Sequence, residues 1–148
     1  MEKRQKPPER LWLEGISPDA ISLIPPSIES IRKVSASKLR NALASTLNHV
    51  RKQKESRLIT RNNRTVGLIV PTELGEIIRD YKTKIGFAAA NTQISDILSR
   101  IENGWENFII DLEGKNLAIM GPLQIFDAMD AARNRTIQMS VLAEENKK

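Results

Sequence analysis

The chain has 148 residues, of which 40% are hydrophobic and 28% charged, a composition typical of a globular protein large enough to bury a core. The absence of cysteine excludes disulfides, thiolate metal sites and cysteine nucleophiles. No apolar run approaches the roughly 18 residues that a membrane-spanning helix needs, and the polar start lacks the apolar region of a signal peptide. We therefore expect a soluble, cytoplasmic protein with no membrane partner.

The formal net charge of +5 is unevenly distributed along the chain. Residues 1–82 hold 16 basic and 9 acidic side chains, whereas residues 83–148 hold 7 and 9. From Arg32 to Arg64 there are ten basic residues and only one acid, Glu55. Because concentrated positive charge attracts polyanions, this is the segment where we expect nucleic acid to bind.

Residues 1–31 are predicted to form an N-terminal extension. Ser17 and Pro18 provide an N-cap and a first helical residue for a short helix, which a pair of prolines would end. We expect Trp12 and the neighbouring leucines to pack against the main core. The alternative is that this segment is a peptide that docks on a partner.

A first structural unit is predicted over residues 32–82. It opens with a short strand, which leads into a helix whose N-cap is Ser35 or Ser37. Basic side chains of this helix, such as Arg40, lie off its apolar face and so point to solvent or to a ligand. That apolar face recurs at spacings of four, four and three residues and consists of Leu39, Leu43, Leu47 and Val50.

A β-hairpin and a second helix complete this unit. Residues 56–60 and 65–70 are strand-like, and Asn62 and Asn63 between them tolerate the positive φ angles of a tight turn. After the second strand, an amphipathic helix is predicted that includes residues 74–81.

The second half repeats the apolar pattern of the first at a constant shift in residue number. Residues 43–78 fall on residues 94–129 without a gap, and the hairpin turn falls on Glu113-Gly114. We therefore predict a second unit over residues 83–135. The remaining residues, 136–148, are predicted to be a tail that frays at its charged end.

The basic residues are not repeated. Arg40 falls on Asn91 and Arg61 on Leu112, so the second unit keeps the predicted scaffold without the basic face. We expect Phe108 and Leu112 to be buried, whereas their counterparts in the first unit are expected to be solvated.

Two stretches of the first unit resemble the Phd/YefM family of antitoxins from bacterial toxin–antitoxin operons. They are VSASKLRNAL, from Val34 to Leu43, and LITRNNRTVGLIVPTEL, from Leu58 to Leu74. The resemblance implies an α+β strand-helix-hairpin-helix unit that dimerises, binds operator DNA and represses its own operon. With the second unit, it implies a tandem duplication that forms a pseudo-dimer. We expect the segment with which the family wraps a toxin to be missing here or reduced to residues 136–148.

The resemblance also implies which residues contact DNA. Family members use the arginine of the Ser-x-x-Arg helix and nearby basic residues, which here correspond to Arg40 and Arg61. Other basic residues are expected to contact phosphates, and the two serines are N-caps first and phosphate ligands second. The candidate DNA-binding residues are Ser35, Ser37, Lys38, Arg40, Arg61 and Arg64.

Two functions remain open at this point. The first is a sequence-specific DNA-binding, antitoxin-like repressor that acts as a homodimer on a double-stranded operator. The alternative is a protein–protein interaction module that neutralises a toxin-like partner without binding DNA itself. The sequence contains no glycine-rich phosphate loop, HExxH motif or nucleophile elbow. We therefore expect no enzyme, metal or cofactor.

Overall fold

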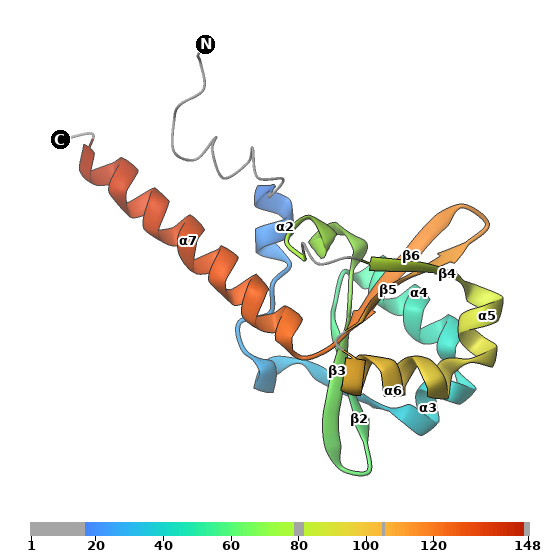
Figure 1. Cartoon of the computed structure of the whole chain (residues 1–148). Helices are drawn as coiled ribbons and strands as arrows, with labels where there is room; N and C mark the ends of the chain where they lie inside the picture. The colour runs from blue at the N-terminus through green and yellow to red at the C-terminus, as the bar shows by residue number, and fades with distance from the viewer. Residues whose placement is uncertain (1–16, 79–81, 105, 147–148) are drawn as a thin grey trace.

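The computed structural model describes residues 17–78, 82–104 and 106–146, so Trp12 lies outside the described residues. At its centre is a six-stranded sheet in the order β1-β2-β3-β6-β5-β4 (Figure 1). The outer pairs, β1–β2 and β4–β5, are parallel, and the remaining neighbours are antiparallel. The strands are β1 (Arg32–Ser35), β2 (Arg57–Arg61), β3 (Arg64–Val70), β4 (Lys82–Gly86), β5 (Asn107–Leu112) and β6 (Lys115–Gly121).

Helices cover both faces of this sheet, which makes the protein a mixed α+β fold, as predicted. The described α-helices are α2 (Pro18–Ser22), α3 (Ala36–Asn41), α4 (Leu43–Gln53), α5 (Phe87–Thr92), α6 (Ile94–Gly104) and α7 (Gln124–Asn146). Two short 3-10 helices, η1 (Ile28–Ser30) and η2 (Thr72–Glu76), lie in the connections.

The core has two apolar layers, one on each face of the sheet. Helices α3 to α6 cover one face, and the predicted helix face from Leu39 to Val50 is buried there, as expected. Helices α2, η2 and the first turns of α7 cover the other face, where Ala20 and Ile24 are buried against the sheet. Residues 17–31 therefore pack on the main core.

The second half repeats the element order of the first at the predicted shift. Adding that shift to the bounds of α3, α4 and β3 gives the bounds of α5, α6 and β6. Irregular features recur in the same way: α3 and α4 are separated at Ala42, and α5 and α6 at Gln93. The strand registers shift after Ile59 and after Ile110.

The two halves meet through equivalent residues at the centre of the sheet. Strands β3 and β6 pair antiparallel, with Ile69 opposite Met120. These two positions are counterparts in the repeat. In the flanking pairs, Leu68 lies opposite Gly121 and Val70 lies opposite Ile119. Gly121 is the counterpart of Val70 and Ile119 is the counterpart of Leu68, so these pairs are also related by the repeat. The pairing therefore has the geometry of a two-fold contact between like surfaces.

Two predicted helices differ from the structure. The helix after Ser35 is divided at Ala42, whose φ of −140° and ψ of 42° leave the helical region. The helix expected over residues 74–81 is only the 3-10 helix η2 within the described range, and Tyr81 lies outside that range. Gly75 disfavours a regular helix there, and a Cβ atom at Gly75 would lie 3.1 Å from Ile119 Cδ1, so the segment packs tightly on β6.

The C-terminal residues also differ from the prediction. Helix α7 continues without a break to Asn146, through most of residues 136–148, which were predicted to form a tail that frays at its charged end. No proline or glycine interrupts residues 124–146, so nothing in the local sequence ends the helix. Its C-terminal half runs away from the sheet (Figure 1).

No helix within the described ranges is long and apolar enough to cross a membrane. Across those same residues, no group of three or more His, Cys, Asp or Glu side chains is arranged to hold a metal ion.

Candidate nucleic-acid interface

Ser35 sets the start of helix α3, which together with its N-cap carries four of the six candidate residues. The Ser35 hydroxyl oxygen accepts a hydrogen bond from the backbone N–H of Lys38 at 3.0 Å. Of the two serines predicted as the N-cap, Ser35 is therefore the one that caps helix α3. With the helix start fixed, Ala36 and Leu39 are buried and Arg40 is exposed.

The hairpin between β2 and β3 carries the other two candidates. Asn62 and Asn63 have φ angles of 53° and 63°, the paired positive angles of a two-residue hairpin turn. Arg61 and Arg64 are register partners on either side of the turn. Arg61 is half-buried, whereas Arg64 is exposed.

Helix α3 and this hairpin together form an open cavity of about 350 Å³. We call its lining the α3–hairpin face: Ser35, Ala36, Ser37, Arg40, Thr60, Arg61, Asn62 and Asn63. The lining holds four of the six predicted residues, two cationic side chains and no acid. Hydroxyl, amide and guanidinium groups on one surface suit the oxygens of a phosphate backbone.

Arg40 and Arg61 differ in how they are held. Arg61 Nη1 donates a hydrogen bond to Ser99 Oγ at 3.3 Å and lies 3.9 Å from Glu102 Oε1. By contrast, Arg40 has no hydrogen-bond or ion-pair partner among the residues that the structure describes. Arg61 is therefore pre-oriented, and Arg40 is available to a ligand.

Arg40 also extends the face toward the second unit. A neighbouring cavity of about 440 Å³ is lined by Arg40 together with Phe87 and Asn91 of helix α5. Asn91 is the counterpart of Arg40, so the basic residue and its neutral equivalent border the same surface.

Lys38 and Arg64 lie outside the lining of the α3–hairpin face. Lys38 lines a different cavity of about 310 Å³, beside β1. Arg64 Nη2 forms an ion pair with Glu102 Oε2 at 2.9 Å. The structure therefore brings together two serines and two arginines of the predicted set, and separates the other two residues from them.

The cavity beside β1 contains two candidates, Arg32 and Lys33, that were not singled out from the sequence, together with Arg57, which was among the basic residues expected to contact phosphates. Arg32, Lys33 and Arg57 line it together with Lys38 and no acid. Charge density alone could have suggested them. Their grouping depends on the parallel pairing of β1 with β2, which sets Arg32 opposite Arg57.

The positions expected to be buried in the second unit give a mixed result. Phe108 is fully buried, as predicted, whereas Leu112 is 43% exposed and that prediction was wrong. Leu112 occupies the end of β5 beside the turn, where a side chain has little to pack against. The counterpart of Phe108, Arg57, is itself only 7% exposed, so that position of the first unit is not solvated either.

The described residues of the second unit form no equivalent of the α3–hairpin face. At the corresponding positions, Ser35 is replaced by Gly86 and Ser37 by Ala88. Arg40 and Arg61 are replaced by Asn91 and Leu112, so both arginine charges are lost.

Comparisons of the chain with protein-family models, with curated proteins and with solved structures found no significant match.

Proposed function

We propose that this protein binds double-stranded DNA through the α3–hairpin face. The observation that carries the proposal is the convergence of Ser35, Ser37, Arg40 and Arg61 on one open surface without an acidic lining residue. These residues come from two separate segments of sequence. A solvated set of unrelated charges would have no reason to converge in this way.

The same proposal extends to family and assembly. The chain is a tandem Phd/YefM-like pseudo-dimer, in which the first unit binds an operator and the second supplies the pairing surface. The two-fold meeting of Ile69 with Met120 supports this, because a duplicated unit would pair through equivalent residues. Two such chains form the homodimer that represses the operon.

A binding assay with matched variants tests the DNA site. Fluorescence anisotropy would compare a duplex from upstream of the chain's own reading frame with a scrambled duplex over a range of salt concentrations. We expect tighter binding to the first duplex and a steep loss of affinity with salt. Arg40→Ala should weaken specific binding by about 1–3 kcal/mol without changing the fold, since Arg40 is exposed.

The second unit supplies the control. Asn91→Ala alters the counterpart of Arg40 at the edge of the same surface, and we expect it to leave DNA affinity within a factor of about two. Equal affinity of the wild-type protein and Arg40→Ala for the upstream duplex would refute the site.

Binding of a toxin-like protein is the second candidate function. Among the α7 side chains that the structure describes, two large apolar ones are exposed, Ile137 at 54% and Leu142 at 52%, and both lie on the half that extends beyond the sheet (Figure 1). Exposed apolar side chains on a projecting helix favour a protein partner. The test is titration calorimetry with the product of the neighbouring reading frame. Ile137→Glu should abolish binding, whereas Arg40→Ala should not affect it.

A further inference from the structure

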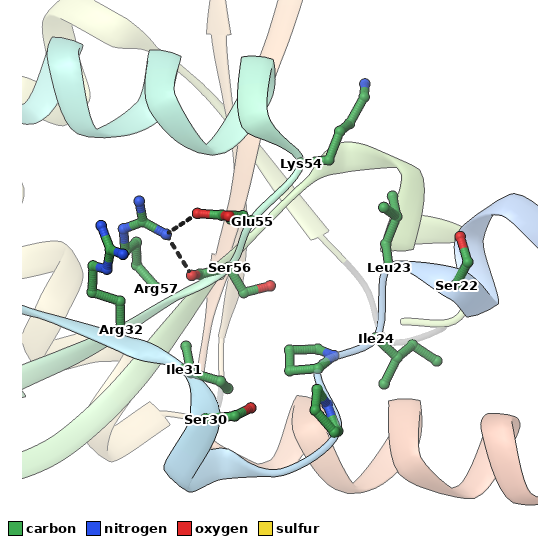
Figure 2. Close-up of a pocket in the computed structure, with 12 residues that line it drawn as sticks. Ser22, Leu23, Ile24, Ser30, Ile31, Arg32, Lys54, Glu55, Ser56 and Arg57 are labelled. Atoms are coloured by element: carbon green, nitrogen blue, oxygen red, sulfur yellow. Dashed lines mark hydrogen bonds and ion pairs between the residues drawn. The ribbon is translucent and has the colours of Figure 1, made fainter.

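Arg32 and Arg57 place two guanidinium groups on one face of the sheet at its edge. They are register partners in the parallel pairing of β1 with β2. Side chains alternate along a strand, so Arg32 shares a face with Val34 and Arg57 with Ile59, and these two apolar residues belong to the core layer under helices α3 to α6. Figure 2 shows both guanidinium groups on the opposite side of the strands from Leu23. Both arginines therefore face the cavity beside β1, which α4 also lines.

This cavity is surrounded by more positive charge than the protein balances. Lys33 and Lys38 line it together with the two arginines. Within the described residues, Glu55 is the only acid that pairs with any of these four cations, through Arg57 Nη1 at 3.4 Å. Four cations and one carboxylate leave three uncompensated positive charges around a single open space.

The cavity also offers hydrogen-bond donors that the protein does not use. Arg57 is only 7% exposed, and its Nη1 donates to Ser56 O at 2.9 Å and to the Glu55 carboxylate. Its Nη2 and Nε donate to no described residue, and the Thr46 hydroxyl of α4 has no described partner either. Unused donors on a buried cation are costly, and a guanidinium fork matches the oxygens of a phosphate.

The second unit fills the corresponding position with a closed, neutral arrangement. Phe108 and Arg100 are the counterparts of Arg57 and His49. The Arg100 guanidinium lies 5.2 Å from the centroid of the Phe108 ring, and Arg100 Nη2 pairs with Glu106 at 2.7 Å. The same scaffold therefore folds with an apolar ring under a paired arginine. The buried, incompletely paired cation of the first unit is not a requirement of the fold.

We propose that the cavity beside β1 binds a small phosphomonoester through its dianionic phosphate. Arg57 and Arg32 donate to the phosphate oxygens, and Lys38 and the Thr46 hydroxyl approach the same group from α3 and α4. A phosphomonoester carries about two negative charges at neutral pH, which the three uncompensated cations accommodate.

The shape of the cavity favours a small molecule over a nucleic-acid backbone. Its volume of about 310 Å³ lies at the lower end of the roughly 300–1,000 Å³ that is usual for ligand pockets. Arg57 is buried, and a phosphodiester of a duplex is flanked by a sugar on each side, which keeps it from entering a recess. The cavity shares no residue with the α3–hairpin face, so the proposal does not rest on DNA binding.

A nuclear magnetic resonance titration of the isotope-labelled full chain at mildly alkaline pH tests the site. Methyl phosphate supplies the dianionic monoester, and dimethyl phosphate is the matched monoanionic diester. We expect methyl phosphate to shift the Arg57 Nε–H signal and the backbone amides of β1 saturably, and dimethyl phosphate to bind at least about fivefold more weakly. Equal affinity for the two probes, or no saturable shift at these positions, would overturn the proposal.

Variants then test which cations hold the phosphate. Arg32→Gln and Lys38→Gln each change an exposed side chain of the lining, and we expect each to weaken methyl phosphate binding about three- to tenfold. Lys115→Gln removes the same charge from an exposed position on the hairpin of the second unit and should change the affinity by less than about twofold. Circular dichroism melting curves show that each variant is folded. Wild-type affinity in both folded lining variants, or an equal loss in Lys115→Gln, would refute the site.

Discussion

Glu102 Oε2 lies 2.9 Å from Arg64 Nη2, which joins helix α6 of the second unit to the hairpin of the first. The other carboxylate oxygen lies 3.9 Å from Arg61 Nη1. Glu102 therefore shares its charge between the two arginines at the end of the hairpin. The Glu102 carboxylate therefore holds the end of the hairpin against helix α6. It also competes with any DNA phosphate for the positive charges of Arg61 and Arg64.

The first prediction follows from this competition. Glu102→Gln should raise affinity for DNA by about two- to tenfold at low salt, and the gain should shrink as salt rises, because it is electrostatic. Anisotropy titrations at several salt concentrations measure it. Glu106→Gln is the matched control, since it removes the same charge from the carboxylate that pairs with Arg100 at 2.7 Å. An equal gain in both variants would mean that net charge alone is responsible.

The second prediction concerns the stability of the protein in acid. Burial raises the pKa of Glu73, but a hydrogen bond from Lys54, one from the backbone and the charge of Lys54 together outweigh burial, so the pKa lies below its ordinary value. The unfolded chain therefore takes up this proton at a higher pH than the folded protein. The stabilisation is fully present at neutral pH and is lost as pH falls through and below about 4.

Melting curves of the wild-type protein and Glu73→Gln across that range measure the effect. We expect the wild-type protein to melt at a higher temperature at neutral pH, and the difference to narrow steadily as the solution becomes more acidic. Glu29→Gln changes an exposed carboxylate on η1 and serves as the control. A difference between the wild-type protein and Glu73→Gln that stays constant with pH would contradict this role for the carboxylate.

The third prediction tests the tight packing at the centre of the sheet. A Cβ atom at Gly67 would lie 2.8 Å from the backbone oxygen of Gly121 and 3.0 Å from Ile101 Cγ2. Gly67→Ala should therefore destabilise the protein by about 1–3 kcal/mol in urea unfolding. At Gly86 an added Cβ meets nothing within 4 Å, and Gly86→Ala should cost no more than about 0.5 kcal/mol. Equal stability of the two variants would be inconsistent with close packing at Gly67.

Local signals in the sequence predicted part of this structure well. The N-cap at Ser35 and the turn at Asn62 and Asn63 depend on short-range chemistry, and both were confirmed. The same signals could not predict the division at Ala42 or the short η2, which occur where the chain packs against other elements. Neither could they show that Glu102 would pair with Arg64, since the two are distant in sequence and meet only through the packing of α6 beside β3.

In the candidate site, too, local sequence predicted only part of the arrangement, and the rest depends on how distant segments pack. Residues close in sequence on α3 were predicted to act together, yet Lys38 lines a different cavity from Arg40. Helix geometry explains this, because a step of two residues rotates a side chain by about 200°. Arg61 lines the same cavity as Arg40 because β1, which leads into α3, pairs with β2, which ends at Arg61. No local sequence pattern specifies that pairing.

The last prediction concerns how one chain meets a symmetric operator. Each chain offers one α3–hairpin face, because Asn91 and Leu112 replace the arginines in the second unit. A palindromic site presents two equivalent half-sites, so two chains are needed to occupy it. Light scattering of the complex at saturating protein should give two chains per palindromic duplex, and one chain on a duplex cut to a single half-site. One chain on the full palindrome at saturating protein would mean that the repeat has replaced dimerisation and that a single half-site suffices for binding.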